Sequence, residues 1–152
     1  MNPILFADFD GVMHPVGGDV APLEYAPLLI TALEPYPSVR IVLSTSWVAA
    51  FGFDDTRAML PLELQRRVIG ATYHSHMKRN MHPKWWVSAT RYQQIAHYVQ
   101  RHAVARWLAI DDDDEGWPAE HRDQLVRTSA YAGLASAVTQ AELADKLRSL
   151  MS

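Results

Sequence analysis

Residues 3–12 read Pro-Ile-Leu-Phe-Ala-Asp-Phe-Asp-Gly-Val, and this stretch decides the fold. A short apolar run such as residues 3–7 is typical of a buried β-strand, and Asp8 and Asp10 follow at its carboxyl end. In open α/β sheets, ligands bind at that edge. Two carboxylates crowded there repel each other unless a cation or a proton lies between them. The pattern therefore predicts a divalent metal site.

A second acidic cluster follows another apolar run later in the chain. Residues 107–110, Trp-Leu-Ala-Ile, end directly in Asp111 and Asp112. If both strands are parallel neighbours, their carboxyl ends meet, and Asp8, Asp10 and one or both of Asp111 and Asp112 form a hard-oxygen site suited to Mg²⁺. Because Mg²⁺ also binds phosphate oxygens, this site indicates phosphoryl chemistry. We expect the next acids, residues 113–115, to form a solvated loop.

Hydroxyl groups close a third predicted strand. Residues 39–43, Val-Arg-Ile-Val-Leu, form a β-branched run that ends in Ser44, Thr45 and Ser46. These residues also stand where a following helix would begin, so they offer O–H and backbone N–H donors to an anion. Two predicted strand ends thus carry carboxylates that suit a metal ion, and the third carries donors that suit an anion.

At these residues the chain resembles the haloacid dehalogenase (HAD) superfamily of phosphatases and phosphotransferases. Its first motif, Asp-x-Asp-Gly-Val after a strand, matches residues 8–12; Ser44 matches the second motif, and the pair at 111–112 matches the fourth. More narrowly, residues 8–15, 43–47 and 107–113 look like the small HAD domain of bacterial Swiss Army Knife RNA-repair proteins. The resemblance spans nearly the whole chain.

The resemblance implies a role for each motif residue. Asp8 would be the nucleophile that forms an aspartyl phosphate, and Asp10 would be the general acid and base. The implied Mg²⁺ shell contains a carboxylate oxygen of Asp8, the backbone carbonyl of Asp10 and an acid of the fourth motif. Asp112 is the first choice for that acid and Asp111 the second.

A cation is also needed, because the metal alone does not neutralise the three oxygens of a transferring phosphoryl group. The third motif of the family supplies a Lys or Arg near a helix start before the fourth strand. Candidates are Arg91, Lys84 and Lys78. Arg91 precedes residues 92–98, whose apolar spacing is helical, so it stands at the expected helix entrance, although a solvent-facing helix residue is the alternative.

Elsewhere, the chain alternates strand-like and helical segments. We expect helices over residues 23–33 and after a cap at Thr139, and strands over residues 66–70 and 125–128. This order predicts a Rossmann-like α/β fold: an open, mainly parallel sheet with helices on both faces. The length of 152 residues fits one HAD-like catalytic domain, residues 1–152. Only a short link separates Asp10 from Ser44, so we expect an essentially capless enzyme with an open mouth.

Charge is segregated along the chain. The net charge of −3 argues against generic nucleic-acid binding, yet residues 64–110 contain no Asp or Glu. Within that window, residues 73–86 mix cations and aromatics, as in proteins that hold single-stranded nucleic acid. The alternative is that Trp85 and Trp86 pack into a core or dimer interface. His14 either contacts substrate or is a turn histidine satisfied by the fold, and we expect Trp47 in the core.

The sequence therefore favours a Mg²⁺-dependent phosphomonoesterase. The preferred substrate is a 5′ or 3′ phosphate on an RNA or DNA end, bound with help from Thr45, Lys84, Lys78 and His14. Nucleotides, small metabolites and phosphoproteins are alternative substrates, and a non-catalytic module that binds a phosphorylated ligand is the alternative function. Repair-system proteins are expected partners. With no cysteine and no membrane-spanning stretch, we expect a soluble cytoplasmic protein.

Overall fold

Five parallel strands form the single sheet of the computed structural model, which describes residues 1–17, 21–74 and 82–152, except for the side chains of residues 82–84. The spatial order is β3-β2-β1-β4-β5. The strands are β1 (Ile4–Ala7), β2 (Arg40–Leu43), β3 (Val68–Ala71), β4 (Trp107–Asp111) and β5 (Leu125–Arg127). The predicted Rossmann-like α/β fold is confirmed.

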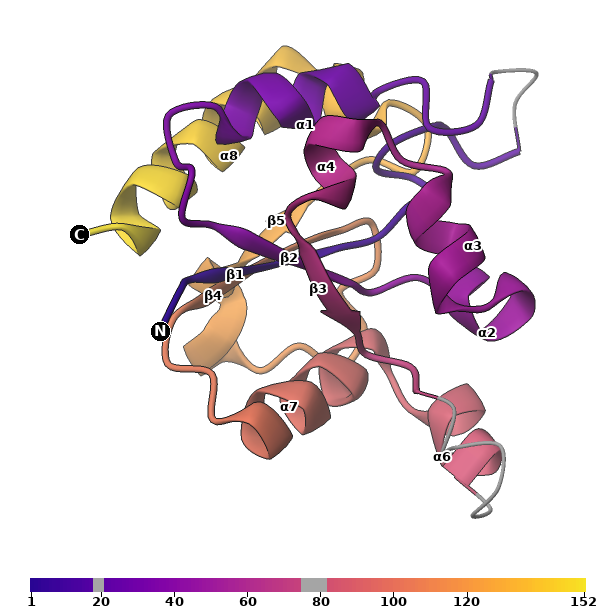
Figure 1. The fold of residues 1–152 in the computed structure, drawn as a ribbon. Coiled ribbons are helices and arrows are strands. Elements are labelled where there is room, and N and C mark those ends of the chain that lie inside the picture. The colour runs from indigo at the N-terminus through magenta and orange to yellow at the C-terminus, as the bar shows by residue number, and fades with distance from the viewer. Residues whose placement is uncertain (18–20, 75–81) are drawn as a thin grey trace.

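Helices cover both faces of this sheet (Figure 1). Helices α1 and α8 lie above the sheet and α7 lies below it, as Figure 1 shows. The α-helices are α1 (Ala26–Leu33), α2 (Trp47–Phe51), α3 (Phe53–Ala58), α4 (Leu62–Gln65), α6 (His82–Ser88), α7 (Arg91–His102) and α8 (Ala137–Leu150). Two short 3₁₀ helices are η1 (Ala119–Gln124) and η2 (Gly133–Ala135).

The side chains of β1 alternate between two hydrophobic clusters, because successive residues of a strand point to opposite faces. Leu5 and Ala7 belong to the larger cluster, which includes buried residues of α1 and α8. Ile4 and Phe6 belong to the smaller cluster, which includes Ile95 of α7. The fully apolar β1 is therefore explained by burial on both faces.

Two predicted helix starts are wrong. The first helix begins at Ala26 instead of residue 23, because Leu23 has a φ of +61° and Pro27 occupies the first turn, where proline fits. The cap of the last helix is Ser136, whose side chain accepts a hydrogen bond from the backbone N–H of Thr139. Thr139 itself lies inside the helix.

Strand register places the functional motifs at one edge. Ala7 pairs with Leu43 on one side and with Ile110 on the other, so the residues that follow each of them lie next to one another. Those residues are Asp8, Ser44 and Asp111. The described residues form no separate cap domain above this edge; that the enzyme is capless and that residues 1–152 are one catalytic domain stay predictions.

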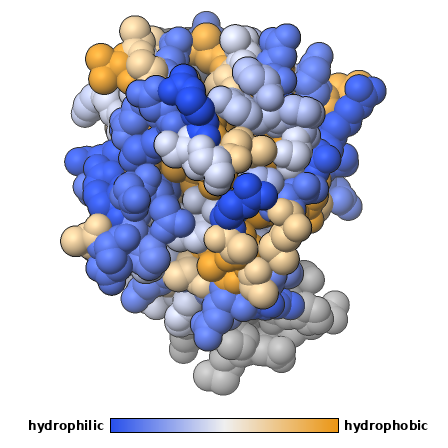
Figure 2. All heavy atoms as spheres, turned by 90° about the vertical axis from the view of Figure 1, so that its left-hand side faces the viewer, coloured by the Kyte–Doolittle hydropathy of each residue, from blue (hydrophilic) through white to orange (hydrophobic). Residues whose placement is uncertain are grey.

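Figure 2 looks at the face where the strands begin and both chain ends lie, and its surface is mostly hydrophilic with small hydrophobic patches. Among the described helices, none has the length and apolarity that crossing a membrane requires.

Gly133 is predicted to be essential for packing the loop after β5 against the first motif. Its φ is +50°, and a Cβ there would lie 2.5 Å from the Val12 carbonyl oxygen. Gly133→Ala should cost about 1–2 kcal/mol for the backbone conformation and about 1–3 kcal/mol for overpacking. Gly17→Ala is the matched control, because Gly17 has a φ of +70° but a Cβ there meets no described atom within 4 Å. Equal losses in thermal unfolding would contradict the packing role.

Candidate active site

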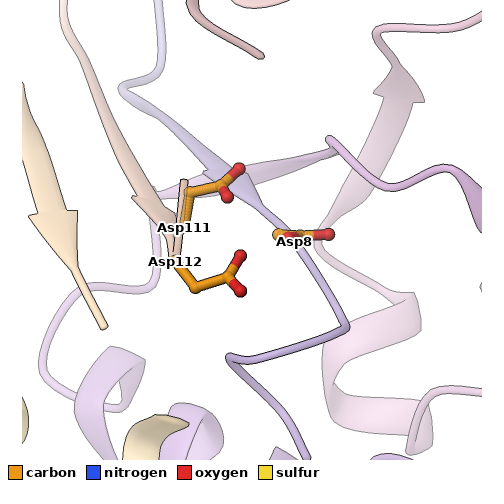
Figure 3. Close-up of side chains that lie close together, drawn as sticks. All are labelled: Asp8, Asp111 and Asp112. Carbon is orange, nitrogen blue, oxygen red and sulfur yellow. The ribbon is translucent and has the colours of Figure 1, made fainter. Parts of the chain in front are cut away.

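Three carboxylates meet at the carboxyl edge of β1 and β4 (Figure 3). Asp8, Asp111 and Asp112 each offer an oxygen, and these oxygens lie within 4.8 Å of one another. Asp8 and Asp111 are buried and Asp112 is half-buried. Among the described residues this is the one group with metal-binding spacing, and its hard oxygen donors suit Mg²⁺.

Hydrogen bonds orient two of these carboxylates and leave one oxygen without a bond. Asp8 Oδ1 accepts the backbone N–H of Phe9 at 2.8 Å, and Asp111 Oδ1 accepts that of Asp113 at 3.0 Å. Asp111 Oδ2 is buried and accepts no hydrogen bond from the described residues. It lies 3.2 Å from Arg91 Nε, which is ion-pair distance without hydrogen-bond alignment. An unsatisfied buried carboxylate oxygen fits a metal ligand.

Burial and mutual repulsion raise the pKa of both buried acids. Burial raises the pKa of Asp8 to about 6; the Arg91 guanidinium opposes this shift, and the charges of Asp112 and Asp10 add to it. Burial and the nearby Asp8 raise the pKa of Asp111 well above its usual value. Without a metal ion this site therefore favours binding protons, as expected for crowded carboxylates.

Arg91 is the cation of this edge. A capping box formed by Thr90 and Gln93 begins α7, so Arg91 is the first helical residue. One terminal nitrogen, Nη2, lies 3.8 Å from Asp8 Oδ1, while Nη1 donates to the Ser44 carbonyl oxygen and lies 3.5 Å from Ser44 Oγ. Burial lowers the pKa of Arg91, but Asp8 and Asp111 outweigh burial and the net shift is upward.

The other two cation candidates lack a described side chain. Lys78 lies outside the described residues, and Lys84 belongs to α6 without a described side chain. The expected helix entrance is confirmed for Arg91, and its side chain is mostly buried rather than solvent-facing.

Ser44 and Thr45, the first two hydroxyl residues after β2, differ in their surroundings. Ser44 is buried beside Arg91, and its backbone N–H donates to the Ala7 carbonyl oxygen. Thr45 is fully buried, and its hydroxyl oxygen accepts the backbone N–H of Trp47 at 3.2 Å. The structure therefore brings Ser44 to the cluster, whereas the Thr45 side chain stabilises its own turn.

Comparison with known families agrees with the resemblance noted from the sequence motifs. The HAD domain of Swiss Army Knife RNA-repair proteins matches residues 4–138. This chain belongs to that family. No curated protein and no solved structure gave a significant match.

In this HAD domain, Gly11 allows Asp112 to reach the cluster. Gly11 has a φ of +76°, and a Cβ on it would lie 2.5 Å from Asp112 Oδ2. Because the Asp112 carboxylate lies over the glycine, a side chain at position 11 would displace a metal-ligand candidate. The position of Asp112, in the fourth motif, thus explains why the first motif has a glycine at position 11.

Asp10 occupies a different environment from Asp8. Its carboxylate is about half exposed, with a side-chain exposure of 46%, and lies outside the three-carboxylate cluster. The Leu23 N–H donates to His14 Nδ1 at 3.0 Å, so His14 Nε2 is the nitrogen that donates to Asp10 Oδ1, at 2.7 Å. Trp47 Nε1 donates to Asp10 Oδ2 at 2.9 Å.

Sequence reasoning missed the contact of Trp47 with Asp10. Trp47 does pack against the core, as expected, but its indole N–H also holds the carboxylate. His14 is satisfied by the fold on one nitrogen and contacts Asp10 with the other. The position of Trp47 three residues after Ser44 was a weak signal, because it does not reveal which way the indole points.

Metal binding is predicted to depend on pH. Protonation of Asp8 relieves a buried charge, so the metal-free protein should gain stability as the pH falls through about 6. Mg²⁺ requires the ionised carboxylates, so the increase in Tm that saturating Mg²⁺ produces should grow as the pH rises through about 6. Differential scanning fluorimetry with and without Mg²⁺ measures both trends.

Asp112→Asn should abolish most of this Mg²⁺-dependent increase. Asp113→Asn is the matched control, because it removes the same charge from an exposed neighbour outside the cluster. If both variants keep the full increase in Tm at high pH, the cluster is not the metal site.

Proposed function

We propose that this HAD domain is a Mg²⁺-dependent phosphomonoesterase that acts through an aspartyl phosphate on Asp8. One observation carries the proposal: the Asp8 carboxylate shares one cluster with the acids Asp111 and Asp112, and the cation Arg91 lies against both Asp8 and Asp111. Arg91, together with a metal ion held by these acids, would let a phosphate dianion approach a carboxylate nucleophile without net repulsion.

In the first step, a carboxylate oxygen of Asp8 attacks phosphorus and the bond from phosphorus to the ester oxygen breaks. The leaving alkoxide takes a proton from the Asp10 carboxyl group. In the second step, Asp10 removes a proton from water, whose oxygen attacks phosphorus and releases inorganic phosphate from Asp8. The bond from Phe9 N–H to Asp8 Oδ1 fixes the orientation of the nucleophile.

Arg91 and the Ser44 hydroxyl are proposed to bind phosphoryl oxygens. The guanidinium is already held by Ser44, Asp8 and Asp111, so little reorganisation is needed when charge develops. Carboxylates of Asp8, Asp112 and Asp111, with the backbone carbonyl of Asp10, would hold Mg²⁺. The ion supplies charge neutralisation at the phosphoryl group.

The favoured substrate is a 5′ or 3′ phosphate on an RNA or DNA end. Two observations support it: the family is named for RNA-repair proteins, and the described residues form no cap over the site. An uncapped site admits a polymer end, whereas water exclusion around a small metabolite usually needs closure. Repair-system proteins are the proposed partners, and a cytoplasmic location is part of the same proposal.

Asp8→Asn is predicted to reduce phosphate release by about 10³-fold or more, because an amide is a very weak nucleophile. The measurement compares p-nitrophenyl phosphate, 5′- and 3′-phosphorylated oligonucleotides, nucleotides and sugar phosphates with Mg²⁺. Asp145→Asn on the exposed face of α8 is the control for loss of charge. Activity of Asp8→Asn near wild type would remove the nucleophile assignment. No release by the wild-type chain would favour a module that binds phosphate without turnover.

Asp10→Asn is predicted to slow the hydrolysis of alkyl phosphates more than that of p-nitrophenyl phosphate, because a good leaving group needs less protonation. Trp47→Phe removes the N–H that holds Asp10 while keeping most ring packing. It should show the same substrate bias with a smaller loss, about tenfold on an alkyl ester. Trp117→Phe is the control, since its indole N–H donates to His121 instead. A uniform loss on both esters would argue against positioning of the acid.

A further inference from the structure

The outer side of strand β3 borders a groove that the proposed chemistry does not use. Strand β3 is an edge strand of the sheet, between the layer of α2 and α3 and the layer of α7 (Figure 1). The groove has a volume of about 460 Å³. Its walls come from the end of α2, the start of α3, strand β3 with the residues that follow it, and the second half of α7.

Local backbone features of β3 shape this groove. The register of β3 against β2 shifts at one point, where Ile41 pairs with Val68 and Val42 pairs with Gly70, so Ile69 is an extra residue. Ile69 is exposed and lines the groove. Gly70 lets the Tyr98 hydroxyl approach the strand, since a Cβ there would lie 3.2 Å from that oxygen. A bulge and a glycine thus open the strand edge instead of covering it.

The polar groups of the groove suit an anion. The lining contains Arg101, His97 and His102 and no acidic residue. Arg101 is exposed and forms no ion pair with any residue in the described part of the chain. Thr72 is 2% exposed, and its hydroxyl makes no hydrogen bond among the described residues. A buried hydroxyl without a hydrogen bond, in a groove that also holds the unpaired cation Arg101, suits a polar, negatively charged partner.

Aromatic side chains stand next to two histidines of the groove. The rings of Trp85 and His97 are 5.0 Å apart, and Trp85 is partly exposed. Tyr98 packs against His102 at 4.1 Å. Cations combined with exposed aromatic faces favour single-stranded nucleic acid over a phosphopeptide, because bases stack on rings. Trp86, by contrast, is buried against Tyr73, which confirms the core alternative for that tryptophan alone.

The groove reaches the same edge of the sheet as the candidate active site, because Ala71 of its lining pairs with Leu43. The backbone N–H of Thr72 donates to Leu43, the residue before Ser44. Helix α7 runs from Arg91 at the carboxylate cluster toward Arg101. At about 1.5 Å per residue, His97 lies about 9 Å and Arg101 about 15 Å along the helix from Arg91. That span matches roughly three to four nucleotides at a stacked spacing of about 3.4 Å.

We propose that this groove binds the nucleotides next to the phosphorylated end of a single-stranded RNA or DNA. The proposal rests on the proposed function, because it assumes that the terminal phosphate reaches Asp8. It adds the path of the nucleic-acid strand: the terminal phosphate lies at the carboxylate cluster, bases lie near Trp85 and His97, and backbone phosphates lie near Arg101. It also explains why residues 64–110 lack acids, since this segment supplies β3, α6 and α7.

The test is the dependence of affinity and turnover on oligonucleotide length. For the wild-type chain with Mg²⁺, KM should fall about tenfold or more from a mononucleotide to a single strand of about four nucleotides and then stay constant. Arg101→Gln should lose at least about fivefold more kcat/KM on a phosphorylated hexanucleotide than on p-nitrophenyl phosphate. Arg106→Gln is the matched control, because Arg106 is an exposed arginine near Leu150, outside the groove lining.

A binding measurement separates this proposal from the proposed function. Asp8→Asn protein and a fluorescent phosphorylated hexanucleotide give a Kd without turnover. Adding Arg101→Gln or Trp85→Ala to the Asp8→Asn protein should raise this Kd at least about fivefold, and adding Arg106→Gln should leave it unchanged. Binding that Arg101→Gln and Arg106→Gln weaken equally, or a phosphopeptide of equal charge that binds as tightly, would overturn the groove assignment. Failure of turnover with groove-dependent binding intact would overturn the phosphatase proposal alone.

Discussion

Crowding of carboxylates at the end of two adjacent strands is the constraint on which the rest of this structure depends. Three acids within ion-binding distance destabilise one another, and burial increases the cost. The fold places Arg91 against two of them, at the start of a helix fixed by a complete capping box. One guanidinium compensates only part of the negative charge, so burial, with the repulsion that remains, raises the pKa of Asp8 and of Asp111.

The same crowding explains details of the surrounding backbone. Gly11 is needed because the Asp112 carboxylate lies where a side chain would be. Thr128 donates from its hydroxyl to the Gly11 carbonyl oxygen, and Gly133 brings the next loop against Val12. The turn after β1 is therefore held from several elements, which limits how far the acids can move apart.

Asp8 and Asp10 show how two acids separated by one residue acquire different environments. Asp8 is buried beside a guanidinium, whereas Asp10 is about half exposed and receives N–H groups from His14 and Trp47. The difference in burial comes from the backbone: β1 ends at Ala7, and the turn that follows carries Asp10 away from the cluster. Different surroundings are what a nucleophile and a proton donor require.

The sequence by itself determined the sheet and the motif positions. Apolar runs ending in Asp8, Ser44 and Asp111 predicted three neighbouring strand ends, and the strand register confirms that placement. Helical spacing after Arg91 predicted a helix entrance, which the capping box confirms. Such features are local and periodic, so they can be read along the chain. Two helix starts were predicted wrongly, because Leu23 takes a left-handed conformation and Ser136 rather than Thr139 forms the cap. Only the tertiary structure decided that Trp47 holds Asp10, that Asp112 lies over Gly11, and that β3 and α7 enclose a groove. These contacts join residues distant in sequence through side-chain directions, and no periodicity of the chain encodes such directions.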